Sequence, residues 1–149
     1  IMSRRHDLLV AIVKLFKDNL NGVDYTSNLY NNIDYEIKFW DEVEQYSYVG
    51  INLGSEVREY EPSGVKWGYA ALTIRVYVQE ETPNDSLNQL LEDIEDIIDR
   101  NNNIEYQPGV KTVEIQVQTI VTDEGVMAPL GIGELQAQIR YDLPVVCYG

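Results

Sequence analysis

The stretch "DEGVMAPLGIGELQAQIRYDL" (residues 123–143) begins as a glycine-rich loop and ends in alternating apolar and polar residues. Such alternation is typical of a β-strand with one buried and one exposed face. The residues expected on the buried face are Leu135, Ala137, Ile139, Tyr141 and Leu143. Those expected on the exposed face are Glu134, Gln136, Gln138, Arg140 and Asp142. The second half of the stretch therefore predicts a core strand, whereas the apolar residues of the loop need a separate explanation.

Three other segments show strand patterns. In "YAALTIRVYVQE" (69–80) the predicted inward residues are Leu72, Ile74, Val76 and Val78, and the outward ones are Thr73, Arg75, Tyr77 and Gln79. An earlier strand is indicated by Val49, Ile51 and Leu53, and a later one by Val113, Ile115, Val117 and Thr119. Between the first two strands lies a polar excursion, residues 54–68, with a turn at Pro62 and Gly64. We expect this excursion to extend the two strands as a hairpin-like arm.

Two segments carry apolar residues at the spacing of an amphipathic helix. The first, residues 6–20, has the apolar stripe Leu8, Leu9, Ile12, Val13, Leu15, Phe16 and Leu20, and Ser3 or Asp7 can cap it. The second runs to about Arg100 after a predicted capping box at residues 86–89. Its predicted core face is Leu87, Leu90, Leu91, Ile94, Ile97 and Ile98. Its predicted solvent face is Glu92, Asp93, Glu95, Asp96 and Asp99.

The order helix, strand, strand, helix, strand, strand predicts an α+β fold. We expect a mainly antiparallel sheet of about four strands, with two helices packed on one face and long protruding loops. Residues 23–42 lack a sustained period and are expected to be loop with short extended pieces. A chain of 149 residues favours a single domain spanning residues 1–149.

Composition argues against several classes of function. The net charge of −14 disfavours binding to phosphate backbones, because that affinity comes from Lys and Arg displacing counterions. The single cysteine, Cys147, excludes an internal disulfide, and the single histidine, His6, excludes a His-rich metal site. Neither residue has a catalytic partner at motif spacing. The sequence therefore predicts no catalytic, cofactor or metal site.

Four stretches, taken in order, resemble the tail terminator (tail completion) proteins of long-tailed bacteriophages. They are "FWDEVEQY" (39–46), "GSEVREYEPSGVKWGY" (54–69) leading into "LTIRVYV" (72–78), "LLEDIEDIID" (90–99) and "TDEGVMAPLGIGELQAQIRYDL" (122–143). The resemblance covers roughly residues 8–145. It implies a small α+β virion protein at the head-proximal end of the tail, assembled in the host cytoplasm.

The resemblance also implies partners. Six copies would form a ring that caps the tail tube, stops its polymerisation and offers a face to the neck or connector protein. DNA would pass through the lumen without specific binding, and no residue would be catalytic. A head–tail connector or neck joining protein is the nearest alternative, and an acidic binding module that mimics nucleic acid is a further one.

A ring subunit would explain the apolar loop of the opening stretch. Val126, Met127 and Leu130 suit a loop that docks on another subunit or on the tube, although it could also fold back over its own core. The arm is the second predicted contact region, because charged and aromatic residues suit a polar interface. Its candidate interface residues are Glu56, Arg58, Glu59, Tyr60, Glu61, Lys66 and Trp67.

Overall fold

The computed structural model describes residues 3–25, 32–35, 47–62, 64–79, 83–124, 126 and 128–144. In chain order these residues form α1 (Arg4–Asn19), β1 (Ile33–Asp34), β2 (Tyr48–Tyr60), β3 (Val65–Gln79), α2 (Pro83–Arg100), β4 (Glu105–Gln107), β5 (Val110–Lys111), β6 (Glu114–Thr122) and β7 (Leu130–Pro144). The predicted α+β class is confirmed. Most of the predicted loop at residues 23–42, and all of the stretch 39–46, lie outside the described residues.

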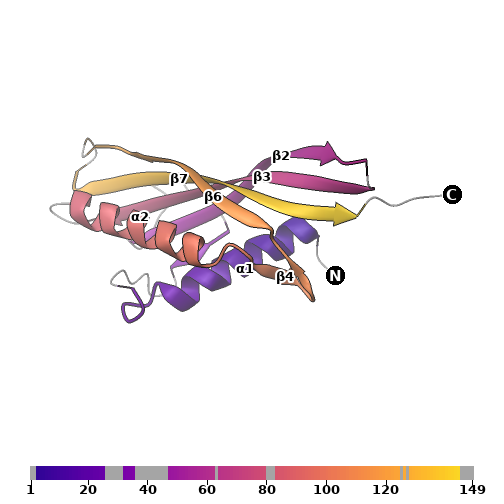
Figure 1. The fold of residues 1–149 in the computed structure, drawn as a ribbon. Coiled ribbons are helices and arrows are strands. Elements are labelled where there is room, and N and C mark those ends of the chain that lie inside the picture. Colours follow the sequence, from indigo (N-terminus) through magenta and orange to yellow (C-terminus); the bar gives the residue numbers. More distant parts are fainter. Residues whose placement is uncertain are drawn as a thin grey trace.

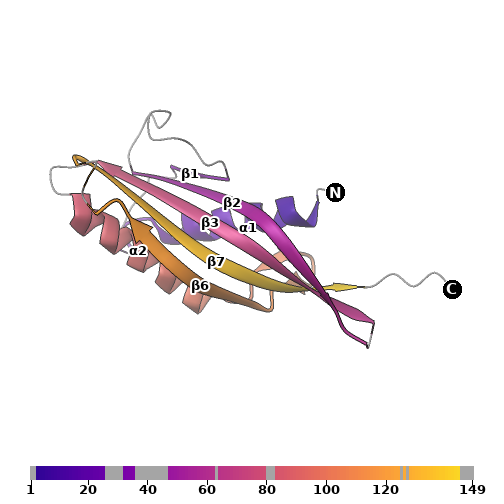
Figure 2. The same cartoon turned by 90° about the horizontal axis from the view of Figure 1, so that it is seen from above.

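One sheet of five strands forms the upper layer of the molecule in Figure 1, and both helices lie below it. The strand order is β1-β2-β3-β7-β6, with β1 parallel to β2 and the other neighbours antiparallel. Seen from above, α2 runs in roughly the same direction as the strands, on the side of the sheet where β6 lies (Figure 2). We call the face that carries the helices the inner face and the opposite one the outer face.

The strand predicted in residues 123–143 is β7, which lies between β3 and β6 and pairs with β3 from Leu130 to Pro144. Four of its predicted inward residues, Leu135, Ala137, Ile139 and Tyr141, are buried, which confirms the register there. The side chain of the fifth, Leu143, lies outside the described part of the structure. The strand starts earlier than predicted, however. A Cβ at Gly133 would approach the Leu91 side chain to 3.0 Å, so this glycine allows α2 to pack closely on the sheet.

The two amphipathic helices cover the inner face with the predicted residues. The Ser3 hydroxyl caps α1 by accepting a hydrogen bond of 3.1 Å from the His6 N–H. All six predicted core residues of α2 are buried in one cluster with the inner faces of β2, β3 and β7. Neither described helix is both long and apolar enough to cross a membrane.

The predicted start of α2 is wrong. The helix begins at Pro83, which puts the predicted capping box inside its first turns. Proline is favoured at the first helical position because its missing N–H has no partner there. One residue of the predicted acidic face also departs from expectation: Asp93 is buried and accepts a hydrogen bond of 2.9 Å from Gln89.

Burial differs from the prediction at some strand positions. Tyr77 does lie on the outer face, but it is buried there in a cluster with Tyr48 and Ile132. Val113 precedes β6 and is exposed, and a bulge between Val117 and Thr119 interrupts the alternation of that strand. The third predicted strand is therefore correct in place, but of its predicted inward residues only Ile115 is buried and Val117 half-buried, whereas Val113 and Thr119 are exposed.

A short hairpin of β4 and β5 was not predicted. The hairpin lies beside α1 (Figure 1). The buried Thr112, which follows β5, ties the end of the hairpin to the segment that precedes β4. This hydroxyl donates to the Asn102 carbonyl at 2.7 Å and accepts from the Ile104 N–H at 2.8 Å. Both strands are too short for a periodic sequence signal.

Candidate interaction surface

Residues 54–68 extend β2 and β3 past the helices as a hairpin, which we call the arm (Figures 1 and 2). The predicted turn is present between β2 and β3, and Gly64 adopts a positive φ of 85° there. The end of β7 pairs with the arm, from Tyr141 opposite Gly68 to Pro144 opposite Val65. By contrast, β6 begins opposite Arg140, so the arm is built from three strands.

A bulge at the base of the arm decides which side chains face inward. Leu53 pairs with Leu72, and the next regular pair is Glu56 with Ala70, so β2 holds one extra residue there. An extra residue reverses the alternation that follows. Glu56 therefore faces the same side as the buried Ala70 and lies toward α1.

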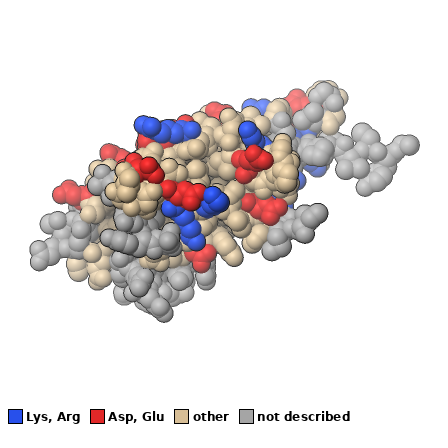
Figure 3. Space-filling view, turned by 90° about the horizontal axis from the view of Figure 1, so that it is seen from below, with Lys and Arg blue, Asp and Glu red and all other residues tan. Residues whose placement is uncertain are grey.

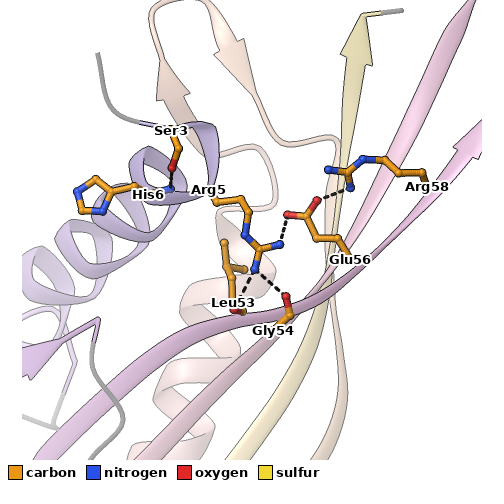
Figure 4. A network of polar contacts seen from close by, with 7 residues as sticks. All are labelled: Ser3, Arg5, His6, Leu53, Gly54, Glu56 and Arg58. Atoms are coloured by element: carbon orange, nitrogen blue, oxygen red, sulfur yellow. Dashed lines mark hydrogen bonds and ion pairs between the residues drawn. The ribbon is translucent and has the colours of Figure 1, made fainter.

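The buried Glu56 carboxylate joins the arm to the first turn of α1 (Figure 4). Arg5 Nη1 lies 2.7 Å from Glu56 Oε1, and Arg58 Nη1 pairs with Oε2. Arg5 Nη2 also donates to the carbonyls of Leu53 and Gly54, at 3.0 and 2.6 Å. One guanidinium thus satisfies both the carboxylate and two backbone acceptors at the bulge.

The same neighbours set the ionisation of Glu56, whose side chain is only 6% exposed. Burial raises the pKa of this carboxyl, but the Tyr141 hydroxyl and the charges of Arg58 and Arg5 outweigh it, and the pKa lies below its ordinary value. Glu56 is therefore held as a carboxylate within the subunit. We assign Glu56 and Arg58, both predicted interface residues, to fixing the arm on the body.

The remaining predicted arm residues lie nearer its tip. Glu59 and Tyr60 are exposed, and Lys66 Nζ lies 5.4 Å from the centroid of the Tyr60 ring. Glu61 is half-buried at the turn. Trp67 lies on the outer face, half-buried beneath the guanidinium of Arg140.

Two residues on this outer face, Tyr69 and Arg140, were not predicted as interface residues. The Arg140 guanidinium carbon lies 3.8 Å from the Trp67 ring centroid and 5.9 Å from that of Tyr69. The exposed Val57 lies opposite Tyr69 in the ladder. Alternation alone placed Arg140 on a polar face; its aromatic neighbours follow only from the register of β7 against β3.

The loop at the start of the opening stretch divides into two parts. Val126 is 83% exposed, as a docking loop requires, and Met127 lies outside the described residues. The prediction that Leu130 belongs to the loop is wrong, because it is the first residue of β7 and is buried in its own subunit. The strand pairs Leu130 with Gln79.

The grouping of potential metal ligands and the surface hollows bear on the predicted absence of a site. No group of three or more His, Cys, Asp or Glu side chains among them could hold a metal ion. A shallow hollow on the outer face has a volume of about 370 Å³ and contains the ion pair of Arg75 with Glu134, 2.8 Å long. Comparison with known proteins gives the class of the protein.

A family model described as "Bacteriophage Tail Tube Terminator Protein" matches residues 2–148. The chain belongs to this family. Among its relatives is the tail tube terminator protein p142 of Escherichia phage T5, which is 31% identical over 155 residues covering 96% of each chain. A member of the tail tube terminator family is a structural component of the phage tail and not an enzyme. The resemblance stated from the sequence is therefore confirmed.

The fold recurs in a distant structure. A chain from the virion of a native gene transfer agent particle superimposes with a TM-score of 0.64 at 12% identity, covering 91% of the present chain and 95% of that one. At this identity the likeness concerns the fold alone. It shows that the tail tube terminator fold persists when most side chains differ.

Proposed function

We propose that this chain forms a ring, of six copies, that caps the finished tail tube, stops its polymerisation and offers a docking face to the neck or connector protein. The observation that carries this proposal is the family match over nearly the whole chain. The tube protein would be the partner on one side and the neck the partner on the other. DNA would pass through the lumen without specific contacts.

The arm supports the proposal because it presents a surface of a kind that subunit contacts use. Its exposed or half-buried residues combine aromatic rings with charges of both signs: Glu59, Tyr60, Glu61, Lys66 and Trp67. Aromatic and arginine side chains are enriched at protein interfaces, and charged rims orient the partners. Val126, exposed at the other end of the sheet, gives a second candidate contact.

Shortening the arm tests this function. In the variant, residues 60–66 are replaced by Asn-Gly, which keeps the Glu56 network and the base of the hairpin. We expect the melting temperature to change by only a few degrees, because Tyr60 is exposed and the tip covers no core residue. Introduced into a phage without its own copy of the gene, the variant should leave tails that are abnormally long or lack heads in electron micrographs.

The wild-type gene in the same phage serves as the control and should restore uniform, joined tails. Uniform, joined tails with the shortened arm would remove the arm tip from the function. Uniform tails that lack heads in the absence of the gene would instead favour the head–tail joining alternative, since tube length would then not depend on this chain.

The distribution of charge bears on the second alternative, an acidic mimic of nucleic acid. Such a mimic needs carboxylates in regular rows on one face. On the helix face, Asp and Glu side chains are scattered and several lie beside Lys or Arg (Figure 3). The described residues include the helix ion pairs of Lys14 with Asp18 and Arg100 with Asp96. This pattern favours the tail function.

A further inference from the structure

Arg140 lies on the outer face of β7, next to the base of the arm, and is held there by two aromatic rings. With Trp67 and Tyr69 it forms a unit that we call the arginine–aromatic cluster. A guanidinium stacked on a ring is fixed in its plane, and the N–H groups at its edge remain able to donate. The cluster thus presents an oriented set of donors beside apolar surface.

The acceptor for these donors is missing from the described part of the subunit. Arg140 Nε is buried without a hydrogen-bond partner there. Glu114 is its neighbour across the ladder, but that carboxylate accepts from Gln116 at 2.8 Å. Four of the other arginines, Arg5, Arg58, Arg75 and Arg100, pair with carboxylates, whereas Arg4 stacks on the Tyr141 ring and has no carboxylate partner among the described residues. Arg140 differs from Arg4 in lying on the outer face of the sheet, where a carboxylate of another molecule is a suitable acceptor for its guanidinium.

The chain itself offers a matching surface on α2. Glu92 and Asp99 are exposed, Glu95 is half-buried, and their carboxylates make no hydrogen bond or ion pair with a described side chain. They cannot reach Arg140 of the same subunit, because α2 packs on the inner face and the sheet lies between (Figures 1 and 2). Their charge is complementary to that of the cluster, but the two surfaces cannot meet within one subunit.

We propose that the arginine–aromatic cluster of one copy binds the acidic face of α2, formed by Glu92, Glu95 and Asp99, in the next copy. The inference rests on the proposed ring and names the contact that would build it. Because the two surfaces differ and lie on opposite faces, the contact runs head to tail, the arrangement that closes into a ring. Trp, Tyr and Arg are also the residues that most often dominate the binding energy of interfaces.

Charge reversal with rescue tests the contact. The full-length protein carries Arg140→Glu, or Glu92→Lys with Glu95→Lys and Asp99→Lys, or all four changes, in a phage without its own copy of the gene. Immunoblots of purified tails measure the amount of this protein relative to tube protein. We expect the Arg140→Glu variant and the triple α2 variant each to reduce this amount about tenfold or more, because losing interfacial charge pairs lowers affinity by that factor. The four changes together should restore most of it.

Lys111→Glu is the matched control. It makes the same charge change on the exposed strand β5, which belongs to the separate two-stranded sheet, and should leave the amount at the wild-type level. Melting temperatures of the purified variants show whether each still folds. If Arg140→Glu folds poorly, the α2 variant decides, because its changes lie on the solvent side of the helix.

If either the Arg140→Glu variant or the triple α2 variant is present in tails at the wild-type amount, the proposed contact is wrong. Loss with Arg140→Glu that the α2 changes do not restore overturns α2 as the occupant and indicates a different protein, such as the tube subunit. Neither result touches the proposed function, which fails instead if the wild-type gene does not restore tails of uniform length.

Discussion

Gly68 is the residue at which the arm approaches its own core most closely. A Cβ there would lie 2.9 Å from Tyr141 Cζ, closer than side chains normally approach. We expect Gly68→Ala to lower the free energy of unfolding by about 1–3 kcal/mol, because the buried Tyr141 ring has no space to move away. Urea denaturation of the purified protein measures the change.

Gly54→Ala is the control for this prediction. Its Cβ would meet only the Ala71 carbonyl oxygen at 3.8 Å, an ordinary contact, so it should cost clearly less. Equal losses at the two positions would show that the effect reflects glycine flexibility and not the Tyr141 ring.

Glu56 makes stability depend on pH in a defined direction. Its pKa is lowered in the folded protein, so its stabilisation is complete above the unfolded value of about 4.5 and is lost as the pH falls through the lower folded pKa. We expect Glu56→Gln to be less stable than wild type at pH 7 and the difference to shrink below pH 4.5. Melting temperatures of both proteins between pH 7 and pH 3 measure this. A difference that is constant over the whole range would contradict the assignment.

At the scale of the element, β7 carries the core of the sheet. Ile139 lies on its inner face at 0% exposure, opposite Ala70 on β3 and Ile115 on β6. Ile139→Ala should therefore cost about 2–5 kcal/mol of stability, since the tightly packed surroundings cannot fill the space. Val121→Ala, on the edge strand β6 at 60% exposure, should cost little in the same denaturation assay. Equal costs would mean that the register of β7 is wrong.

The arm shows how one element can invert a prediction made from its sequence. The alternation that ends at Leu53 would place Glu56 on the solvent side, and the bulge places it against Arg5. Bulges have no dependable sequence signal, because the extra residue is accommodated by contacts with other segments. Here those contacts come from α1, 48 residues earlier in the chain.

At the scale of the whole molecule, charge is unevenly distributed. The arm, the first turn of α1 and Arg140 of β7 together hold five basic residues (Arg4, Arg5, Arg58, Lys66 and Arg140) and four acidic ones (Asp7, Glu56, Glu59 and Glu61), whereas α2 holds six acidic residues and one basic residue. A head-to-tail ring would bring such unlike regions together while keeping the total strongly negative. This asymmetry suits an assembly whose subunits recognise one another through electrostatic complementarity.

The total charge predicts that the residues lining the channel of such a ring carry a net negative charge. Six copies would carry six times the formal charge of −14, and an acidic wall repels DNA phosphates whereas a basic wall would retain them. If α2 lies between subunits, the lumen acids would come from Glu59, Glu61, Asp123 or Glu124. A structure of the ring on its tail, with the channel residues identified, measures this. An excess of Lys and Arg along the channel would contradict it.

The sequence by itself determined the α+β class, the inward faces of both helices and of β2, β3 and β7, and the family. These follow from periodicity within short segments, and long apolar stripes leave few alternatives. The tertiary structure alone decided three other features: the burial of Glu56, the stacking of Arg140 on Trp67 and Tyr69, and the place of Leu130 in a strand. Each depends on which residues from distant segments become neighbours. That pairing is set by strand register and helix docking, which no local pattern encodes.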